Sequence, residues 1–516
     1  MGRDTVVILG IPIDNLTLEE AVNRIFTLID AYRSDGVPRQ VATVNVDFIV
    51  NTLTWKPEGV RHPELLDILR RADMVTADGM PLVWLSRLLG CPLKERVTGA
   101  DMVPALAAEA ARRGKSLFFL GGRNGIGQQA ATLLQQRNPG MIIAGVSSPF
   151  VSTEGEQLTD FELEDAAIIE EINAARPDIL LIAFGNPKQE LWFARNAPRL
   201  RVPLSIGIGG TYEFIVGTVS RAPIWVQKTG MEWIYRILME PRRLWKRYAI
   251  GLAKFVLHAW PLIRLHRADR KRIALQPQAS RPTASTPRRI EQSCWVVTLP
   301  PRLDALAVKS LEPDIEHVHR SDDNLILDFI QVDLVDASGL GFLVRLWRQN
   351  LKTAGKVYLV SFNAHVLEFL RFNRVADLFK ERLFNNQETA LSHIRAESKQ
   401  SVSLPPYTVS FLPNGTGILA LCGRLDAAAV KNFPFDQILA QLSEYNCILD
   451  LRELDFADSS GLVAFHRIQR QVTKGGRSCI LCAPREPVLQ LLRLTRLDRL
   501  FTITDEQAIL AGRSAT

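Results

Sequence analysis

The sequence has little of what marks secreted proteins. Its six cysteines are scattered over 516 residues, too few and too far apart for a disulfide framework. The first residues, MGRDTVVILG, hold no apolar signal core before Pro12 and Asp14. We therefore expect a protein of the reducing cytoplasm.

Metal ligands are equally scarce. No group of His and Cys residues has the spacing of a metal site. Cys479 and Cys482 fall in an expected strand, SCILC, where positions i and i+3 point to opposite faces, so we assign them to the core. Residues 1–220 show no convincing D-x-D at a strand end, the pattern that would hold Mg²⁺ beside a nucleotide sugar. We expect neither a metal nor a cofactor, and a leaving diphosphate would then need arginines.

The overall composition is that of a folded protein with several domains. Hydrophobic residues make up 47% and charged residues 23% of the chain, close to globular averages, which excludes collagen-like, mucin-like and wholly disordered classes. At about 100 to 200 residues per domain, this length predicts roughly three domains.

Positive charge is concentrated in one band. The segment from Arg221 to Arg289 contains 16 Lys and Arg residues and three acidic residues, a net charge of +13, whereas the whole chain carries +7. The band indicates an anionic partner, either nucleic acid or an acidic membrane surface. An ordinary solvated surface helix is the alternative.

An apolar stretch inside this band predicts a helix that lies on a membrane. The run from Tyr248 to Ile263 is interrupted by Lys254, His258 and Pro261 and is shorter than the roughly 20 residues that cross a bilayer. A helix over 242–260, starting after Pro241, turns by about 100° per residue and separates two sets of side chains. One face would hold Arg243, Arg247 and Lys254, and the opposite face Leu244, Tyr248, Leu252, Phe255 and Ala259.

The second half of the chain contains a linker and an internal repeat. Residues 276–290, QPQASRPTASTPRRI, have almost nothing that could pack and predict a linker. After it, PRLDALAV recurs as GRLDAAAV, and LVDASGLGFL recurs as FADSSGLVAF, 122 residues later. Strand patterns alternate with helices opening at Gly339 or Gly461, which predicts two copies of a small α/β domain.

The first 220 residues predict a buried, mainly parallel sheet. Several apolar or β-branched runs, among them QVATVNVDFIV, SLFFLGG, DILLIAFGNP and PLSIGIGG, are separated by helical patterns. In such sheets ligands bind beyond the carboxyl ends of the strands. Chemistry is therefore expected at Thr43 and Asn45, Asp78, 121–127, 185–190 and 209–211.

Three polar residues at these strand ends are candidates for chemistry. Asp78 follows the run 72–77 and precedes Gly79, and a carboxylate in that crevice could have a raised pKa and act as a general base. A helix N-cap is an equally good interpretation of Asp78. Thr43 and Asn45, two apart on one expected strand, would share a face and could hold a substrate hydroxyl or diphosphate, or be ordinary strand-end residues.

The glycine-rich segment 121–127 could let backbone N–H groups approach a phosphate. It does not match G-x-G-x-x-G, and the strand MIIAGV is followed by Ser147 and Ser148, where a dinucleotide site would place an acid on the ribose. Residues 1–220 also lack a Tyr-x-x-x-Lys pair. These observations disfavour an oxidoreductase or epimerase and leave a nucleotide-sugar site open.

Seven motifs in order resemble the WecG/TagA/CpsF family of bacterial glycosyltransferases. They are TVNVDF, TADGMPLVW, RVTGADM, LGGRNG, FGNPKQE, GIGGTYEFIVGTVSRAP and MEWIYRILMEPRR, spread over about residues 5–250. The resemblance implies a Rossmann-like, metal-independent, inverting enzyme. It would move a sugar, of the N-acetylmannosamine type or related, from a UDP donor to a sugar on a polyprenyl diphosphate during surface polysaccharide synthesis. A C-terminal appendage in this family is thought to bring the site to the inner membrane face.

The resemblance assigns roles to matching residues. Asp78 would be the base that deprotonates the acceptor hydroxyl, with Thr43 and Asn45 near the sugars. The nucleotide-sugar side would comprise Gly122, Gly185, Gln189, Glu190, Gly209, Gly210 and Thr211. The UDP leaving group or lipid diphosphate would be offset by Arg96, Arg236, Arg243 and Arg247, each of which is equally well interpreted as a surface or phospholipid contact.

The repeated units resemble STAS domains, the fold of anti-sigma factor antagonists, through RLDA, D-x-S-G-L and a closing R-x-x-x-x-x-L-F. In that family the serine before the glycine can be phosphorylated, which implies Ser338 and Ser460. A phosphate there would add roughly −2 charge at a helix N-terminus. A structural N-cap serine is the alternative, and the first copy has Ala337 where the second has Ser459.

Together these observations predict an α/β protein with five segments: a Rossmann-like core at 1–225, a basic helical appendage at 226–275, a linker at 276–290, and STAS-like domains at 291–398 and 399–516. We expect a cytoplasmic enzyme, peripheral on the inner membrane face, that binds a UDP-sugar and a polyprenyl-diphosphate-linked acceptor but no nucleic acid. A regulatory kinase or STAS-binding protein would act through the repeats, and a homo-oligomer is left open. The alternative is a non-catalytic scaffold that senses nucleotide sugars.

Overall fold

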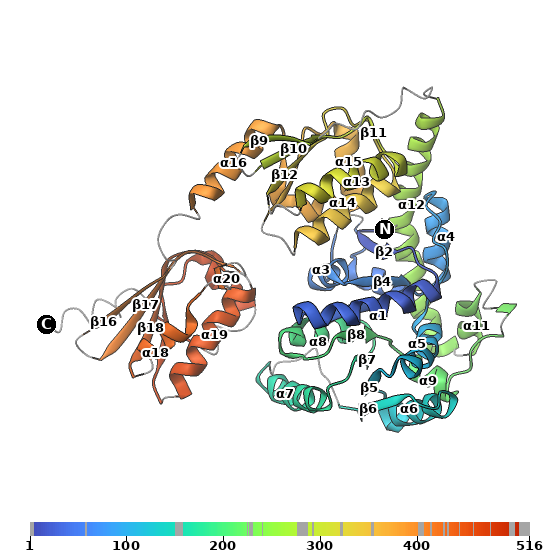
Figure 1. Cartoon of the computed structure of the whole chain (residues 1–516), viewed down its shortest axis with the longest axis horizontal. Helices are drawn as coiled ribbons and strands as arrows, with labels where there is room; N and C mark the ends of the chain where they lie inside the picture. The colour runs from blue at the N-terminus through green and yellow to red at the C-terminus, as the bar shows by residue number, and fades with distance from the viewer. Residues whose placement is uncertain are drawn as a thin grey trace. The chain divides into compact units, whose positions relative to one another are not determined.

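The three-dimensional structure of the protein is a computed structural model (Figure 1). It divides into two compact units, Met1–Ser392 and His393–Thr516. The structure describes residues 5–56, 59–149, 158–223, 225–226, 231–239, 241–275, 287–291, 294–319, 323–351, 355–400, 407–412, 415–426, 429–430, 433–442, 444–457, 459–474, 476–494 and 501–504.

The N-terminal domain of the first unit is built on a six-stranded sheet, which is parallel as predicted. The strand order is β4-β3-β8-β7-β5-β6, and all five pairings are parallel. The strands are β3 (Arg39–Val44), β4 (Met74–Ala77), β5 (Ser116–Gly121), β6 (Ile142–Ser147), β7 (Ile179–Ala183) and β8 (Leu204–Gly207).

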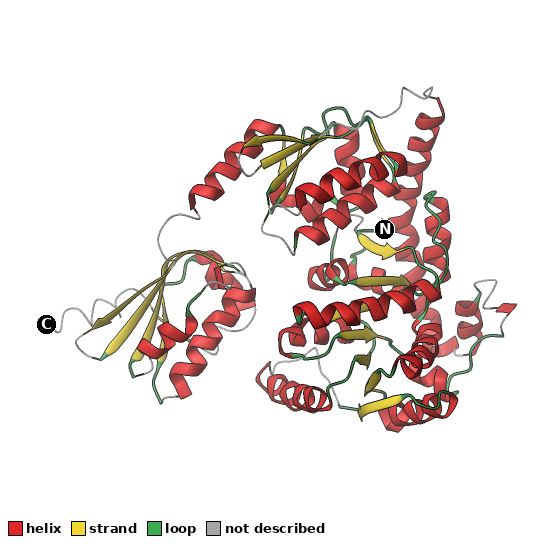
Figure 2. Cartoon of the chain, in the orientation of Figure 1, coloured by secondary structure: helices red, strands yellow, loops and turns green. Residues whose placement is uncertain are grey.

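Helices cover both faces of this sheet, giving three layers (Figure 2). One face packs against α1 (Leu18–Asp35), α5 (Gly99–Arg113), α6 (Ile126–Arg137) and α9 (Thr211–Val216). The other packs against α2 (Val46–Thr52), α3 (Pro63–Arg71), α4 (Met80–Leu88), α7 (Leu158–Ala175) and α8 (Lys188–Asn196). Alternate residues of each strand enter the two cores, for example Leu117 and Phe119 on one side and Phe118 and Leu120 on the other. Short 3-10 turns, η1 (Arg123–Gly125) and η2 (Ala197–Arg199), complete the domain.

A hairpin and a long helix extend this domain. The hairpin pairs β1 (Thr5–Ile8) with β2 (Ile11–Asp14) in antiparallel register. After α11 (Glu232–Met239), the single helix α12 (Pro241–Leu275) begins with Pro241 and runs through Pro261. The expected helix over 242–260 is therefore part of a 35-residue helix.

The two faces of α12 differ from the predicted ones. Leu244, Phe255 and Ala259 are buried as expected of one apolar face, but Phe255 and Ala259 pack into the core of the N-terminal domain. Lys254 is buried with them, and its ammonium donates to the Leu53 carbonyl oxygen at 3.3 Å. Leu252 is exposed on the opposite side. The inner face thus serves protein packing and includes a residue predicted for the charged face.

The first repeat domain has a five-stranded sheet with strand order β15-β14-β12-β10-β9, in which only the edge pair β9 and β10 is antiparallel. Its strands are β9 (Arg288–Glu291), β10 (Cys294–Thr298), β11 (Arg302–Leu303), β12 (Asn324–Asp328), β13 (Leu334–Val335), β14 (Val357–Val360) and β15 (Leu383–Phe384). Its helices are α13 (Ala305–His319), α14 (Ala337–Asn350), α15 (Ala364–Phe372), η3 (Ala376–Arg382) and α16 (Gln387–Gln400).

The second repeat domain, in the second unit, has the same strand pattern in the order β16-β17-β18-β19-β20. Its elements are β16 (Tyr407–Leu412), β17 (Thr416–Leu425), α18 (Phe435–Leu442), β18 (Asn446–Ala457), α19 (Ser459–Lys474), β19 (Cys479–Cys482), α20 (Glu486–Leu494) and β20 (Thr502–Thr504). Cys479 and Cys482 are buried in separate clusters, which confirms their predicted core role. The prediction of two copies of a small α/β domain is also confirmed.

The predicted linker lies mostly outside the described residues. Positions 276–286 are not described, and β9 already begins at Arg288, so the last residues of the predicted linker belong to the first repeat sheet. Over the described part of the chain, no helix combines the length and the apolar character needed to traverse a bilayer.

Candidate functional site

The predicted site residues of the sheet gather at one edge. Asn45, Asp78, Gly122, Gly185 and Gly209 each come within two residues of the carboxyl end of strands β3, β4, β5, β7 and β8. These five strands are consecutive neighbours in the sheet. Because all of them are parallel, the residues that follow them share the edge at which α/β sheets bind ligands.

Asp78 is held by backbone contacts from two directions. Its N–H donates to the Val44 carbonyl oxygen at 2.7 Å, which ties the end of β4 to β3. Its carboxylate accepts from the N–H of Gly99, the first residue of α5. The next helix, α4, has Gly79 as its N-cap, so Asp78 is not the cap of that helix. The carboxylate instead lies at the amino end of α5.

The surroundings of Asp78 make it a weaker acid than an ordinary aspartate. Burial raises its pKa from 3.8 to about 6, against the opposing effects of the Arg96 charge and the Gly99 N–H, while Glu232 and Asp101 raise it further. No ion pair to Asp78 is found among the described residues. A carboxylate with a pKa near the working pH is suited to take up a proton.

Four charged side chains form a closed ring beside Asp78. Arg96 donates from Nη1 to Glu232 Oε2 at 2.8 Å and lies 3.7 Å from Asp101. Arg221 donates from Nη1 to Asp101 Oδ1 at 2.6 Å, and its Nε lies 3.8 Å from Glu232. All four are largely shielded from solvent. Two arginines with two exchangeable acidic partners can bind a diphosphate.

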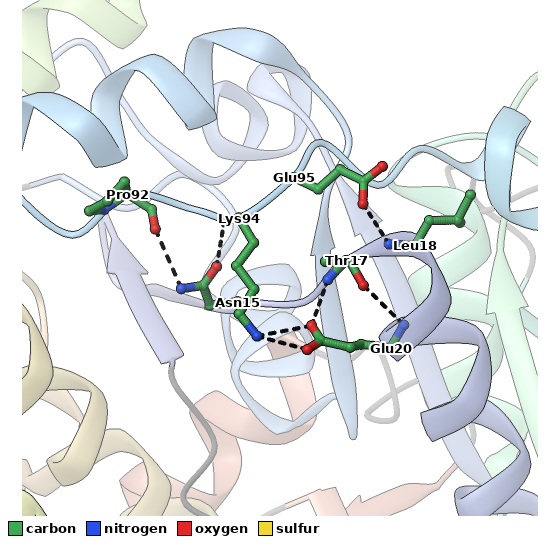
Figure 3. A network of polar contacts seen from close by, with 7 residues as sticks. All are labelled: Asn15, Thr17, Leu18, Glu20, Pro92, Lys94 and Glu95. Atoms are coloured by element: carbon green, nitrogen blue, oxygen red, sulfur yellow. Dashed lines mark hydrogen bonds and ion pairs between the residues drawn. The ribbon is translucent and has the colours of Figure 1, made fainter.

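The loop that carries Arg96 is fixed to the start of α1 (Figure 3). Thr17 and Glu20 form a capping box, and the Glu20 carboxylate also accepts from the Lys94 ammonium at 2.9 Å. Glu95 accepts from the Leu18 N–H at 2.9 Å. On the other side of Arg96, the Val97 N–H donates to the Ala77 carbonyl oxygen at 2.9 Å. Arg96 is therefore held between α1 and the end of β4 by its flanking residues.

Thr43 and Asn45 occupy different structural positions. Thr43 lies on β3, is buried, and donates from its hydroxyl to the Gly207 carbonyl oxygen at 2.9 Å. The strand ends at Val44, so Asn45 does not share it with Thr43 as predicted. Asn45 is instead the N-cap of α2, and its side-chain oxygen accepts from the Asp47 N–H at 3.0 Å. It adjoins Gly79, which places it beside Asp78.

Gln189 joins the ends of β7 and β8. Its side-chain oxygen accepts from the N–H groups of Gly185 at 3.2 Å and Gly209 at 3.0 Å. Its amide donates to Glu190 Oε1 at 2.7 Å. A Cβ at Gly207 would lie 2.5 Å from the Gln189 amide nitrogen, so a larger residue there would displace the Gln189 side chain. The structure thus brings four of the predicted nucleotide-side residues together, with Gln189 and Glu190 buried and Gly185 and Gly209 partly buried.

Glu190 is buried, and its carboxyl group is a weaker acid than an ordinary glutamate. Desolvation raises its pKa from 4.5 to about 8. Its second oxygen, Oε2, has no hydrogen-bond partner among the described residues, and the same is true of both polar atoms of the Asn186 side chain. Buried polar groups are usually hydrogen-bonded, so these atoms of Glu190 and Asn186 are available to hydrogen-bond to a ligand or water.

The remaining glycines of the edge are sites of close packing. A Cβ at Gly122 would lie 2.8 Å from the Gly127 N and 3.0 Å from the Tyr212 ring. A Cβ at Gly99 would lie 2.9 Å from the Thr211 hydroxyl oxygen. The predicted turn 209–211 therefore contacts the residue that donates to Asp78, which brings the two predicted halves of the site together.

The predicted appendage arginines lie in different surroundings. Arg236 on α11 stacks on the Phe214 ring at 5.0 Å. Arg247 on α12 pairs with Asp47 of α2, two residues after Asn45. The side chain of Arg243 lies outside the described residues. Neither Arg236 nor Arg247 belongs to the ring around Asp78. Arg221 and Glu232, which were not predicted, do belong to it.

Three members of the ring lie inside the sequence motifs but are not among the predicted site residues. Asp101, Arg221 and Glu232 occur in RVTGADM, GTVSRAP and MEWIYR. Their charge, together with their place inside the family motifs, was a sequence signal for a role in the site. The pairing itself was not readable, since Glu232 reaches Arg96 across 136 residues.

The outer face of α11 and α12 is apolar and exposed. On α12 it includes Trp245 and Trp260, which are 52% and 57% exposed, and Trp225, which precedes both helices, is 70% exposed. Leu238 is 73% exposed at the end of α11. The outer face also includes Met239, Leu252, Val256 and Leu257, and the exposed cations Arg242 and Lys246. An exposed apolar surface of this kind marks an interaction site.

The two predicted phosphorylation sites lie near helix starts. Ser338 is the second residue of α14, whose N-cap is Asp336, so the alternative of an N-cap serine is wrong for Ser338. Asp336 accepts from the N–H groups of Ser338 and Gly339 at 2.8 and 3.0 Å. Ser460 lies in α19, but its side chain is outside the described residues.

A parallel sheet with a weakly acidic carboxylate and paired arginines at its carboxyl edge defines a Rossmann-like group-transfer enzyme. The model of the glycosyl transferase WecG/TagA/CpsF family matches residues 6–269. The chain belongs to this family of glycosyltransferases. The STAS domain model matches residues 286–390 and 412–508, which identifies both repeat domains as STAS domains.

Two relatives have the same name, N-acetylglucosaminyldiphosphoundecaprenol N-acetyl-beta-D-mannosaminyltransferase. One, from Staphylococcus aureus (strain MRSA252), is 30% identical over 251 residues, 49% of this chain and 89% of the relative. The other, from Bacillus spizizenii, is 29% identical over 199 residues, 39% of this chain and 72% of the relative. Among solved structures, the unphosphorylated anti-sigma factor antagonist SpoIIAA is 21% identical with a TM-score of 0.18, covering 21% of this chain and 97% of that one.

Proposed function

We propose that the protein transfers a sugar of the N-acetylmannosamine type from a UDP donor to a polyprenyl-diphosphate-linked sugar during surface polysaccharide synthesis. The names of the relatives support transfer of an N-acetylmannosaminyl group to this acceptor class. The observation that carries the proposal is Asp78, a carboxylate with a pKa of about 6 beside paired arginines at the strand ends.

In the proposed reaction Asp78 removes the proton from the acceptor hydroxyl. The oxygen then forms a bond to the anomeric carbon, while the bond from that carbon to the diphosphate breaks and UDP leaves with the electron pair. Attack from the side opposite UDP inverts the anomeric centre. Asn45, which lies beside Gly79 and close to Asp78, would orient a sugar in this reaction.

The charge of the departing diphosphate falls to arginines in this proposal. Arg96 and Arg221 are paired with Glu232 and Asp101 in the ring beside Asp78. We infer that a diphosphate displaces the Glu232 carboxylate from the arginines, since both groups present anionic oxygens to the same guanidinium groups. Preorganised cations need no metal to stabilise the leaving group.

The outer face of α11 and α12 would place this site at an anionic membrane. Tryptophans favour the interface between headgroups and acyl chains, and Arg242 and Lys246 would attract acidic lipids. The inner face of α12 packs on the catalytic domain, so contact with lipid would orient the domain toward a polyprenyl acceptor. The protein would then be peripheral on the cytoplasmic membrane face.

The STAS domains would recruit or regulate the enzyme, through a kinase or a binding protein. A phosphate on Ser338 would add charge next to Asp336, whose carboxylate already faces the start of α14. Mass spectrometry of protein from cells should find phosphate on Ser338 or Ser460 under some condition. Its consistent absence, with partner binding unchanged by Ser338→Asp and Ser460→Asp, would assign both serines a structural role.

The test of the proposed reaction uses the purified full-length protein. It is mixed with a panel of UDP-sugars and a short-chain lipid-diphosphate-sugar acceptor, and Asp78→Asn is compared with the wild type. We expect transfer with one donor and its near loss in the variant. Undiminished transfer by Asp78→Asn would remove Asp78 from the mechanism, and no transfer with any donor would favour the scaffold alternative.

A further inference from the structure

One helix of the first repeat domain packs directly on the N-terminal hairpin of the transferase domain. Helix α14 lies beside β1 (Figure 1). A Cβ at Gly341 would lie 2.2 Å from the Thr5 carbonyl oxygen, so only glycine permits this approach. Val7 of β1 packs in the core of the repeat domain, whereas its neighbours Val6 and Ile8 pack in the core of the transferase domain. Strand β1 is therefore shared between the two cores.

Buried polar groups on the two sides satisfy one another. Arg70 of α3 donates to the Gly10 carbonyl oxygen at 3.0 Å and to the Arg374 carbonyl oxygen at 2.7 Å. Arg348 of α14 donates to the Arg70 carbonyl oxygen at 2.8 Å. Arg70 and Arg374 are both buried. Leaving such groups unpaired in a protein interior is costly. Separation of the two domains would therefore be opposed by the loss of these hydrogen bonds.

The same contact reaches the strand that presents Asp78. Arg348 Nη1 lies 3.9 Å from the buried carboxylate of Asp14 at the end of β2. Asp14 Oδ2 also accepts from the Val75 N–H in β4 at 2.8 Å, and Asp14 pairs with Arg24 of α1 at 3.3 Å. Strand β4 ends at Ala77, directly before Asp78. Asp14 thus joins the repeat domain to the catalytic strand.

The second repeat shows that this contact is specific to the first. Val463 occupies the position in the second repeat that corresponds to Gly341 in the first, 122 residues earlier. Val463 is 65% exposed on α19. A valine in place of Gly341 would collide with the Thr5 carbonyl oxygen, although the repeat fold itself tolerates valine there. The first copy is therefore adapted to the transferase domain.

We propose that the first STAS domain positions the catalytic base of the transferase. The face of α14 that carries Ser338, Gly341 and Arg348 packs on the β1–β2 hairpin. Through Asp14, this contact fixes the position of β4 and of Asp78. This inference rests on the proposed transfer reaction. Ser338 lies one turn before Gly341 on the same face, so charge added at Ser338 would fall at the rim of the contact. Undocking of this domain lowers the rate of transfer.

The test is Gly341→Val in the full-length protein, with Val463→Gly as its matched control. Hydrogen exchange measures docking, and initial rates give kcat and KM. We expect faster exchange in 5–14, 74–77 and 338–348 for Gly341→Val, with protection of β12 and β14 retained because the second repeat folds with valine. Its kcat should fall on the order of 10²-fold, as for a misplaced catalytic group, with KM for the donor nearly unchanged. Val463→Gly should match the wild type in both measurements.

A second variant guards against unfolding of α14. Arg348→Ala should lower kcat in the same way, and Arg348→Lys should restore part of it because a cation again faces Asp14. Wild-type kcat in a Gly341→Val protein that exchanges rapidly at the hairpin would overturn the proposal, as would unchanged exchange at the hairpin. Absence of transfer by the wild-type protein would instead contradict the proposed reaction, so the two failures are distinguishable.

Discussion

Two aspartates of the site show how position separates carboxylates at the scale of single residues. The carboxylate of Asp78 accepts from the backbone N–H of Gly99, and burial raises its pKa to about 6. Asp101 lies in the charged ring and accepts from Arg221 and Thr98, which hold its pKa below the usual value despite partial burial. The first can take up a proton near neutral pH, and the second stays charged.

The sequence predicted Asp78 because an apolar strand pattern stops directly before it and a glycine follows. Asn45 was placed on the wrong element, since an asparagine that caps a helix and one that ends a strand look alike in sequence. The ring around Asp78 could not be predicted. Its members come from separate segments, and their pairing depends on how α11 settles beside the loop of Arg96.

The exchange of Glu232 for a diphosphate predicts opposite effects of two substitutions on UDP binding. Glu232→Gln should bind UDP severalfold more tightly, because the ligand no longer displaces a charged competitor from Arg96 and Arg221. Arg221→Ala should bind UDP about tenfold more weakly, as expected for the loss of one charge-assisted hydrogen bond. Isothermal titration calorimetry measures both, with Asp178→Asn at the opposite edge of the sheet as the control. Weaker binding by Glu232→Gln would contradict the exchange.

Glu190 predicts a pH-dependent stability. Its pKa is raised from 4.5 in the unfolded chain to about 8 in the fold, so the unfolded state binds fewer protons between these values. The stabilising contribution of Glu190 is therefore fully present below pH 4.5 and is lost as the pH rises toward 8. Glu190→Gln removes this titration, and its melting temperature should fall less than that of the wild type between pH 5 and pH 8. Parallel melting curves for the two proteins would show that Glu190 is not buried as a neutral acid.

At the scale of elements, α12 shows why periodicity identified a helix but not its surroundings. The sequence pattern separated charged from apolar positions, yet both Lys254 and Phe255 turned out to be buried against the transferase domain. The aliphatic stem of lysine can follow an apolar surface to a polar tip, here the Leu53 carbonyl oxygen. The face left for lipid is the one with Trp245 and Trp260, which the helical pattern alone did not single out.

The exposed face of α12 predicts membrane binding that depends on its tryptophans. The double substitution Trp245→Glu and Trp260→Glu should lower recovery with anionic liposomes in flotation by more than tenfold, since each tryptophan contributes roughly 2 kcal/mol when its exposed half is buried in lipid. Ile330→Glu, an exposed apolar residue of the first repeat domain, is the control and should float like the wild type. Equal recovery of the double variant would reject the interfacial role of this face.

At the scale of the whole molecule, the repeat gives the domain organisation without giving the roles of the copies. Matched motifs 122 residues apart predicted two domains of one fold, and the strand orders confirm it. Gly341 and Val463 look like an unremarkable difference between the copies in sequence. The difference acquires meaning only through the Thr5 carbonyl oxygen, which belongs to a strand more than 300 residues earlier. Contacts of this range have no local signal.

The central claim is that Asp78 is the base of sugar transfer, and the pH dependence of kcat/KM tests it most directly. For the wild type, kcat/KM should rise with pH and level off above an apparent pKa of about 6, because the carboxylate must be ionised to accept the proton. Asp78→Asn should lose on the order of 10²- to 10⁴-fold in rate and this ascending limb together. A variant that keeps the limb at about pH 6, or a wild type with no limb there, would contradict the account.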